Sequence, residues 1–205
     1  MRVSQASKQN TRQAILYAAK AQFLAAGYES ATTRDIASLA GIAAGTLFNY
    51  FPSKQALGLA LVAEANEEAR AEFDRNHRLG ESLEERLFAH IAIQLRHFSP
   101  VRSWIREILH TALNPLLKKG ASDTASALRD AHLERVSKWL AAEPGIKTGC
   151  AQTAVDLHLY WSLYLGVLSF WAHDDSDNQD ATLAFLDRSV GLFCHALSEE
   201  SGHPR

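Results

Sequence analysis

Apolar residues recur along this chain at spacings of three and four, the pattern of helices that bury one face. The first three stretches of this kind run from about Asn10 to Ala26, from Thr33 to Ala40 and from Ala44 to Phe51. Gly27 and Gly41 follow the first two stretches, where a left-handed glycine commonly ends a helix. The opening of the chain is therefore predicted to form three short helices, with Thr33 capping the second.

Six longer helical stretches follow, at about residues 54–77, 82–98, 100–113, 123–142, 149–172 and 181–198. Ser53 is placed to cap the first of these, Ser82 and Glu85 form a capping-box pattern, and Asp180 is placed to cap the last. No alternating pattern typical of strands and no internal repeat is found. The sequence predicts an all-α fold of about nine helices, divided inside the fourth helix into domains 1–58 and 59–205.

Charge divides the chain in a similar way. Residues 1–60 hold six basic and two acidic side chains, whereas residues 61–205 hold fifteen basic and twenty-one acidic ones. A basic first segment beside an acidic remainder indicates that the first segment contacts a polyanion.

Cysteine usage and the N-terminal sequence point to the cytoplasm. Cys150 and Cys194 are too few and too far apart for a disulfide framework or a zinc site. We expect no metal and no cofactor. The polar N-terminus lacks the apolar core of a signal peptide. Residues 157–172 are apolar, but they are too short and too interrupted to span a membrane.

Residues 32–51 carry the pattern of a helix-turn-helix. Ala37 is small where two helices approach, and Gly41 tolerates the positive φ of a sharp turn. Four apolar residues are placed to pin the two helices together: Ile36, Ile42, Leu47 and Phe51. In such a motif the second helix lies in the major groove of DNA. The pattern alone also fits a helical hairpin inside a bundle.

The outward face of the second motif helix is poor in charge but suited to base edges. Its residues are Gly45, Thr46 and Asn49, with Ala44, Phe48 and Tyr50 at the flanks. Asparagine pairs with adenine, and alanine, threonine or an aromatic ring can contact a thymine methyl group. Phosphate contacts are expected from Thr33, Arg34 and Lys54, and from a basic arm with Arg2, Lys8 and Arg12.

About residues 10–58 resemble the DNA-binding domain of the TetR family of transcriptional regulators. The matching positions are Thr11-Arg12, Ile15, Ala18-Ala19, Phe23, Gly27-Tyr28, Thr32-Thr33, Ile36-Ala37, Ala40-Gly41, Gly45-Thr46-Leu47, Tyr50-Phe51, Lys54 and Leu57. The resemblance implies a homodimeric regulator, usually a repressor, whose C-terminal domain binds an inducer. It also places Thr33, Ala44, Gly45, Thr46, Phe48, Asn49, Tyr50 and Lys54 on positions that commonly contact DNA. Phe48 stands where the family usually has tyrosine, so one phosphate-binding hydroxyl is missing.

The last two expected helices are candidates for dimerisation. One face of the eighth helix carries a stripe of mainly small residues, namely Val155, Leu159, Ser162, Gly166 and Ser169. One face of the ninth helix carries an apolar stripe, namely Leu183, Leu186, Val190, Phe193 and Leu197. Two such helices from each subunit would form the four-helix bundle that is usual in this family. Alternatively, both stripes complete the core of the monomer.

An effector pocket is expected between the fourth and eighth helices, with apolar walls and a few polar groups. Its candidate lining residues are Trp104, His110, Trp139, Tyr160, Trp161 and Tyr164. Each of them could instead be an ordinary core residue. Because no arginine cluster is present, we expect an uncharged or weakly polar organic ligand.

Two other functions fit parts of the sequence. His173-Asp174, with His90, His97 and Asp187, resembles the metal-binding dyad of HD-type phosphohydrolases, although that dyad normally sits on a helix and this one begins an acidic loop. The chain could also bind DNA without sensing a ligand. The expected partners are operator DNA, a second copy of the chain and a small molecule, with no membrane.

Overall fold

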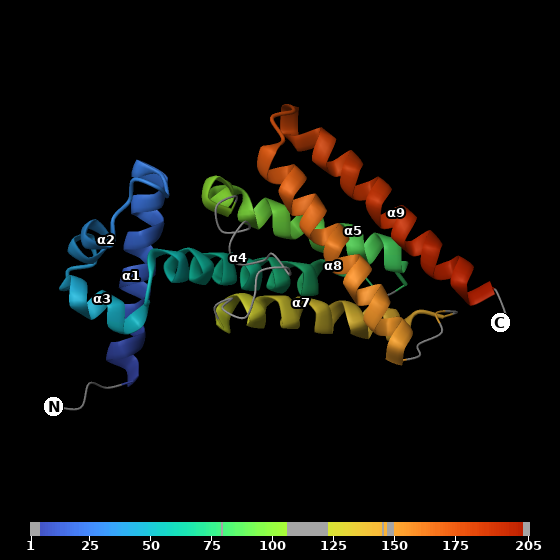
Figure 1. Ribbon diagram of the computed structural model, residues 1–205, viewed down its shortest axis with the longest axis horizontal. Coiled ribbons are helices and arrows are strands. Elements are labelled where there is room, and N and C mark those ends of the chain that lie inside the picture. Colours follow the sequence, from blue (N-terminus) through green and yellow to red (C-terminus); the bar gives the residue numbers. More distant parts are fainter. Residues whose placement is uncertain (1–4, 79, 106–122, 145, 147–149, 203–205) are drawn as a thin grey trace. The chain divides into compact units, whose positions relative to one another are not determined.

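The computed structural model describes residues 5–78, 80–105, 123–144, 146 and 150–202. Within these ranges the chain forms helices and no strand, so the all-α prediction is confirmed. Figure 1 shows α1 (Gln5–Ala26), α2 (Thr33–Leu39), α3 (Ala44–Tyr50), α4 (Lys54–Asn76), α5 (Leu83–Phe98), α7 (Asp123–Ala142), α8 (Cys150–His173) and α9 (Asp180–Gly202), with short 3-10 turns at Ser99–Val101 and Asp177–Gln179.

The expected sixth helix is described only at its start, where residues 102–105 are helical; the rest lies outside the described residues. Of the helices that the structure describes, none is long and apolar enough to cross a membrane.

The chain forms two compact units. The first combines Met1–Ala65 with Phe98–Ala125, and the second combines Asn66–His97 with Ser126–Arg205. The helix α4 begins in the first unit and ends in the second. The sequence predicts a single domain boundary after Gly58, also inside this helix, and the described residues 98–105 belong to the first unit.

The first unit is built on the buried faces of α1, α2 and α3. Its core includes Ile15, Leu16, Ala18, Ala19, Phe23, Ile36, Ala37, Leu47, Phe51 and Leu57. The ring of Phe23 packs edge-on against Tyr28 and Trp104, with ring centroids 5.0 and 5.1 Å apart. Burying each large apolar side chain contributes roughly 1.5–3 kcal/mol, so a few such anchors hold these short helices.

Two helix starts differ from the sequence prediction. The helix α1 begins at Gln5 rather than near Asn10. Its first six residues are exposed, so periodic burial gives no signal there, while alanine, lysine and glutamine favour the helix by propensity. The cap of α2 is Thr32 rather than Thr33, since the Thr32 hydroxyl accepts a hydrogen bond from the backbone N–H of Asp35 at 3.1 Å.

The structure confirms the two helix caps predicted at serine residues, Ser53 and Ser82. The backbone N–H of Ala56 donates to Ser53 Oγ at 3.1 Å, which closes the first turn of α4. At the start of α5, Ser82 N–H donates to Glu85 Oε2 at 2.8 Å, and Glu85 N–H donates to Ser82 Oγ at 3.2 Å. This reciprocal pair is the capping box, and it satisfies backbone donors that the helix itself leaves open.

The second unit packs α5, α7, α8, α9 and the end of α4 around a larger core. Its fully buried residues include Leu87, Ile91, Val136, Tyr160, Val167, Trp171, Leu186 and Val190.

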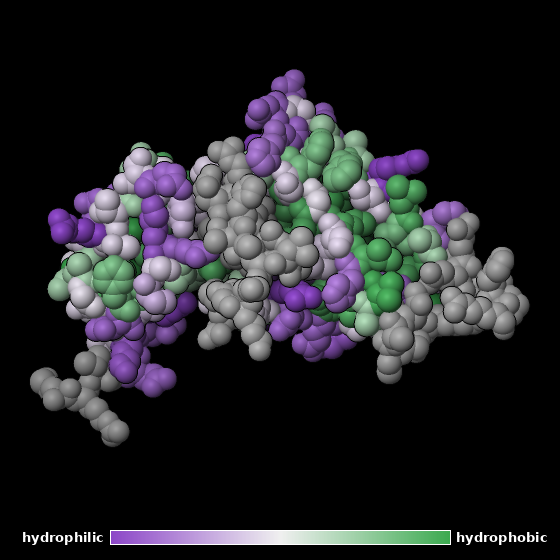
Figure 2. Space-filling view, in the orientation of Figure 1, coloured by the Kyte–Doolittle hydropathy of each residue, from purple (hydrophilic) through white to green (hydrophobic). Residues whose placement is uncertain are grey.

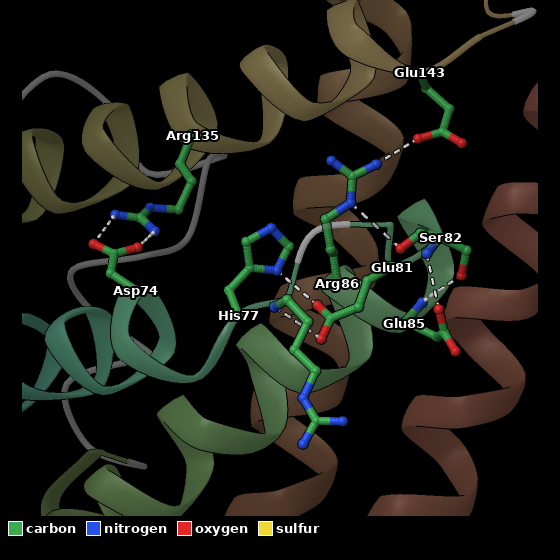
Figure 3. A network of polar contacts seen from close by, with 9 residues as sticks. Asp74, His77, Glu81, Ser82, Glu85, Arg86, Arg135 and Glu143 are labelled. Atoms are coloured by element: carbon green, nitrogen blue, oxygen red, sulfur yellow. Dashed lines mark hydrogen bonds and ion pairs between the residues drawn. The ribbon is translucent and has the colours of Figure 1, made fainter.

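Polar contacts connect helices of the second unit near the end of α4 and the start of α5 (Figure 3). Arg135 of α7 makes two hydrogen bonds to Asp74 of α4, at 2.6 and 3.2 Å, and Arg86 of α5 pairs with Glu143 at 2.5 Å. The Arg135 hydrogen bonds lower the pKa of Asp74. The exposed Arg135–Asp74 pair contributes at most about 1 kcal/mol.

Candidate functional site

The turn between α2 and α3 is a rigid helix-ending motif. Gly41 has a φ of +69°, a conformation that side chains with a Cβ rarely adopt. Its N–H donates to the carbonyl of Ser38 at 3.1 Å, and the N–H of Ile42 donates to the carbonyl of Ala37 at 3.0 Å. These two bonds form a Schellman motif, so the relative direction of α2 and α3 is fixed by backbone geometry.

The helix α3 presents a small and accessible face. Leu47 is fully buried and anchors the helix, whereas Gly45, Phe48 and Asn49 are exposed, Phe48 by 48%. The other predicted contact residues on α3, namely Ala44, Thr46 and Tyr50, are half-buried beside them. A Cβ added to Gly45 would meet no atom within 4 Å, so this face is open. It can approach a flat surface closely.

Lys54, at the first position of α4, already has partners within the protein. Its ammonium group donates to the backbone carbonyls of Tyr28 at 2.7 Å and Glu29 at 3.0 Å, and lies 4.7 Å from the centre of the Tyr28 ring. These contacts tie the turn after α1 to the start of α4. Because an ammonium group has three donors, one donor remains for a phosphate.

Two of the three basic residues of the expected arm, Lys8 and Arg12, lie on helix α1. Lys8 is exposed on its first turns, and the guanidinium group of Arg12 lies 5.2 Å from the centre of the Phe51 ring. Arg34 is exposed on α2 and Thr33 is half-buried. Arg2 lies outside the described residues.

In the second unit, aromatic rings surround His132 of α7. The His132 ring centroid lies 4.2 Å from that of Tyr164, 5.5 Å from that of Tyr160 and 5.8 Å from that of Trp161. Trp139 packs against the ring of His90, with the ring centroids 5.2 Å apart, and so belongs to the same group. Four of the predicted pocket residues therefore gather here. Trp104 belongs to the first unit instead, and His110 lies outside the described residues.

Burial makes both histidines of this group neutral at pH 7. It lowers the pKa of His132 to about 3, and it lowers the pKa of His90 well below its ordinary value, with smaller effects from the nearby His132 and Arg135. Burial likewise raises the pKa of Tyr160 and Tyr164, so their hydroxyl groups stay protonated. A neutral imidazole carries one hydrogen-bond donor and one acceptor.

Several buried polar atoms in this region have no hydrogen-bond partner among the residues that the structure describes. They are both ring nitrogens of His90, Oε1 of Gln94, Nε of Arg129 and Nε1 of Trp161. Native proteins hold few such atoms, because leaving one unsatisfied costs about 1–3 kcal/mol. Their concentration around His132 marks a site where an outside group could supply the missing hydrogen bonds.

The sequence reasoning missed His90, Gln94 and His132 as members of this site. The helical spacing of His90 and Gln94 could have indicated that they are buried. Both lie on the same face of α5 as the buried Leu87 and Ile91. Polar side chains at positions where the helical period predicts apolar ones are uncommon unless they have partners. Only the packing of α5 against α7 and α8, however, brings them together.

Two family models match the sequence. The model described as "Bacterial regulatory proteins, tetR family" matches residues 15–61, and the model described as "Tetracyclin repressor-like, C-terminal domain" matches residues 86–202. The chain belongs to the TetR family. The resemblance found in the sequence is thereby confirmed, and α2 and α3 are the DNA-binding helix-turn-helix of a TetR-family transcription regulator.

Solved TetR-family structures share this fold. A regulator from Streptomyces coelicolor has a TM-score of 0.65 and 18% identity, over 98% of this chain and 87% of that one. The repressor FadR of Thermus thermophilus, solved in complex with lauroyl-CoA, has a TM-score of 0.64 and 22% identity, over 89% and 93%. The fatty acid degradation regulator FadR of Bacillus halodurans has a TM-score of 0.62 and 15% identity, over 94% and 96%. No curated protein matches the sequence.

The residues expected at the dimer interface differ in how exposed they are within the single chain. On α8, Val155 and Leu159 are 52% and 55% exposed, and Ser162 and Gly166 are exposed with them. On α9, Leu183 is exposed, but Leu186, Val190, Phe193 and Leu197 are buried within the single chain. These four residues face the core of the second unit and have little surface left to bury against another copy. The exposed large apolar residues of α9 are Leu183, which the sequence predicted, and Phe185 and Leu192, which it did not.

The dyad His173-Asp174 has structural contacts. His173 ends α8 and is exposed, whereas the Asp174 carboxylate accepts hydrogen bonds from the N–H groups of Ser176 and Thr182, at 2.9 and 2.8 Å, and from the Thr182 hydroxyl at 2.5 Å. Hydrogen bonds from Ser176 and Thr182 lower the pKa of Asp174. Asp174 thus caps α9, together with Ser176, and the expectation that Asp180 would do so is wrong. Among the described residues, no group of three metal-ligating side chains is placed to hold a metal ion.

Proposed function

We propose that this protein is a ligand-responsive repressor that binds palindromic operator DNA as a homodimer and is released by a small organic effector. The observation that carries the DNA-binding part is the open face of α3, held at a fixed angle by the Gly41 turn. A helix with an exposed Asn49 and no bulky charge fits into a major groove about 12 Å wide.

In this proposal the residues of the motif divide into two roles. Asn49, Thr46 and Phe48 contact base edges, and Gly45 and Ala44 allow the backbone to approach. Thr33, Arg34, Tyr50 and Lys54 contact phosphates and set the register of the helix on the duplex. Lys54 also positions α4 against the turn at Tyr28, so it acts on DNA binding in two ways.

Substitution of Asn49 tests the base contact. Asn49 is exposed, so Asn49→Ala leaves the fold unchanged, while a lost bidentate adenine contact costs about 1–3 kcal/mol, or roughly five- to 150-fold in operator affinity. The affinity for the promoter upstream of its own gene is measured by fluorescence anisotropy. Ser38→Ala, at an exposed position of α2 outside the proposed contacts, is the matched control. An unchanged affinity for Asn49→Ala contradicts the assignment.

Lys54 is tested by the salt dependence of operator binding. If its ammonium contacts a phosphate, Lys54→Met reduces the slope of log affinity against log salt by about 0.9, in addition to weakening binding to every sequence. A purely structural Lys54 weakens binding with the slope unchanged. Measuring the slope over several salt concentrations separates the two roles.

The homodimer is proposed to form through the exposed surfaces of α8 and α9. Figure 2 shows apolar side chains gathered over these two helices. The ring of Phe170 on α8 packs against that of Phe185 on α9, with the ring centroids 5.0 Å apart. A contiguous apolar surface of this kind is typical of an interface. Two-fold dimers match palindromic operators because each half-site takes one recognition helix.

Gly166 allows a clean test of this interface. A Cβ at Gly166 would meet nothing within 4 Å in the single chain, so Gly166→Leu is tolerated by the protomer and disturbs only a close helix partner. We expect sedimentation to show a weakened dimer. Ala131→Leu, at an exposed position on α7, is the control. A tight dimer in the Gly166→Leu variant would place the interface elsewhere.

Effector release is proposed to act through α4, the helix that the two units share. Two recognition helices must lie about 34 Å apart to occupy successive major grooves, and a ligand that tilts α4 changes this spacing. A hundredfold loss of operator affinity requires about 2.7 kcal/mol of preference for the released state. The lauroyl-CoA complex of the Thermus thermophilus relative supports ligand-responsive regulation within this fold. A compound that binds the protein and leaves operator affinity unchanged would contradict the release step.

A further inference from the structure

The unsatisfied polar atoms of the second unit lie on three helices that meet at one point. We call the residues His90, Gln94, His132, Tyr160 and Trp161 the polar cluster. His90 and Gln94 are one turn apart on α5, His132 lies opposite them on α7, and the other two residues lie on α8. The ring of His132 is 5.1 Å from the ring of His90 and 5.8 Å from that of Trp161, so the cluster is continuous.

Internal hydrogen bonds account for only part of the cluster. Gln94 Nε2 donates to Asn66 Oδ1 at 2.7 Å and to His132 Nδ1 at 3.4 Å. His132 Nδ1 is then the acceptor, so the neutral ring carries its proton on Nε2 and donates it to the Tyr160 oxygen, 2.9 Å away. Within the described part of the chain, the atoms left without a partner are one donor and one acceptor on His90, the acceptor Gln94 Oε1 and the donor N–H of Trp161, with the Nε–H of Arg129 beside them.

We propose that the polar cluster binds the effector of this regulator and that the effector is a small, uncharged aromatic molecule with a hydroxyl group, a phenol. The inference rests on the proposed ligand-responsive function and names the class of ligand. A hydroxyl group both donates and accepts, which matches the mixture of unused donors and acceptors. The rings of Phe73, Trp139 and Tyr164 border the cluster and offer aromatic faces.

An aromatic carboxylate is the main competing ligand. A carboxylate cannot donate, so it would leave Gln94 Oε1 unsatisfied, and it would bring a charge among neutral buried groups. The guanidinium group of Arg129, however, lies 5.9 Å from the centre of the Trp161 ring, and its buried Nε has no partner among the described residues. The experiment must therefore compare the two ligand classes directly.

Three matched probes differ only in the group attached to one methyl-substituted ring: p-cresol carries a hydroxyl, toluene carries hydrogen and p-toluate carries a carboxylate. Each is titrated into the full-length protein without DNA, and binding is followed by tryptophan fluorescence and thermal shift. We expect p-cresol to bind about tenfold more tightly than either of the others. Equal or tighter binding of toluene or p-toluate, or no binding of any probe, overturns the proposal.

Substitutions then locate the hydroxyl contact. His90→Phe removes both ring nitrogens and keeps an aromatic ring, and we expect the preference for p-cresol over toluene to fall from about tenfold to about twofold or less. Trp171→Phe is the matched control, because the Trp171 N–H already donates to Gln179 Oε1 at 2.8 Å. It should keep the tenfold preference. If His90→Phe does not fold, Gln94→Met gives the same readout. A variant of His90 or Gln94 that keeps the full preference overturns the assignment.

The test distinguishes this inference from the proposed function. Hydroxyl-selective binding in the absence of DNA supports the ligand class, whatever happens at the operator. Operator binding that persists with p-cresol bound contradicts the release step of the proposed function. Operator binding that no phenol affects, combined with no phenol binding, leaves the DNA-binding role intact and overturns the ligand class.

Discussion

The two units of this regulator place their polar chemistry in opposite environments. In the first unit, the candidate DNA contacts lie on the surface of α2 and α3, and the buried positions hold apolar anchors such as Ile36 and Leu47. In the second unit, the surface over α8 and α9 carries exposed apolar side chains, while His90, Gln94 and His132 are buried. The first unit thus exposes small and polar side chains, whereas the second exposes apolar side chains and encloses polar groups.

This difference affects stability. A surface residue such as Asn49 remains hydrated in the free protein, so the contacts with DNA proposed for it cost the fold nothing. The buried His90 and His132 must stay neutral, and among the described residues neither ring nitrogen of His90 has a hydrogen-bond partner. Both features cost stability that the surrounding apolar core offsets. Substitutions and pH changes should therefore affect the two units differently, with the following expected results from the largest effect to the smallest.

The largest expected effect is a loss of stability on mild acidification. The pKa of His132 is about 3 in the folded protein and close to 6.5 when unfolded, so the unfolded state binds more protons as pH falls below 6.5. Between pH 7 and pH 5 this linkage lowers the free energy of unfolding by roughly 2 kcal/mol, and the lowered pKa of His90 acts in the same direction.

Urea unfolding at a series of pH values measures this effect. The first 76 residues contain no histidine, so the pH dependence in this range belongs to the later part of the chain. His90→Phe should make the dependence shallower. An identical slope in the variant and the natural protein would mean that His90 is not buried in neutral form.

The next effect concerns the turn of the first unit. Gly41→Ala places a Cβ at a φ of +69°, which costs about 1–2 kcal/mol, although no atom lies within 4 Å to clash with it. The cause is therefore backbone strain alone. Thermal unfolding measures the loss, and a Gly41→Asn variant, whose side chain tolerates this conformation better, should recover part of it. Equal losses in both variants would contradict the cause.

Capping of α9 gives a smaller effect in the second unit. Asp174→Ala leaves the N–H of Thr182 without its acceptor at the start of the helix, and we expect Tm to fall by about 3 °C. Asp175→Ala, at an exposed neighbouring position, should leave Tm unchanged. A similar fall in both variants would show that the loop, rather than the cap, is sensitive.

The smallest effect separates stability from DNA binding within the first unit. Gly45 has helical geometry and open space around its Cβ position, so Gly45→Ala should stabilise α3 by about 0.5–1 kcal/mol. If the backbone at Gly45 approaches DNA closely, the same change weakens operator binding. A variant that is more stable and binds DNA as tightly as the natural protein would show that the backbone at Gly45 makes no close contact with the duplex.

The sequence by itself determined the features that depend on neighbours along the chain. Gly27 and Gly41 mark helix ends because their left-handed backbone conformation is a local property, and the capping box at Ser82 and Glu85 is satisfied within one helical turn. The helix-turn-helix was predictable for the same reason, since all its defining residues lie between Thr32 and Phe51.

The tertiary structure alone decided which face of a helix becomes core when both faces are apolar. On α9, Leu186 and Val190 are buried while Leu192 is exposed, and nothing in their hydrophobicity distinguishes them. Packing also brought His90, Gln94 and His132 together, although 38 residues separate Gln94 from His132 along the chain. Long-range contacts of this kind depend on how whole helices pack, because burial and unmet hydrogen bonds are properties of several elements together.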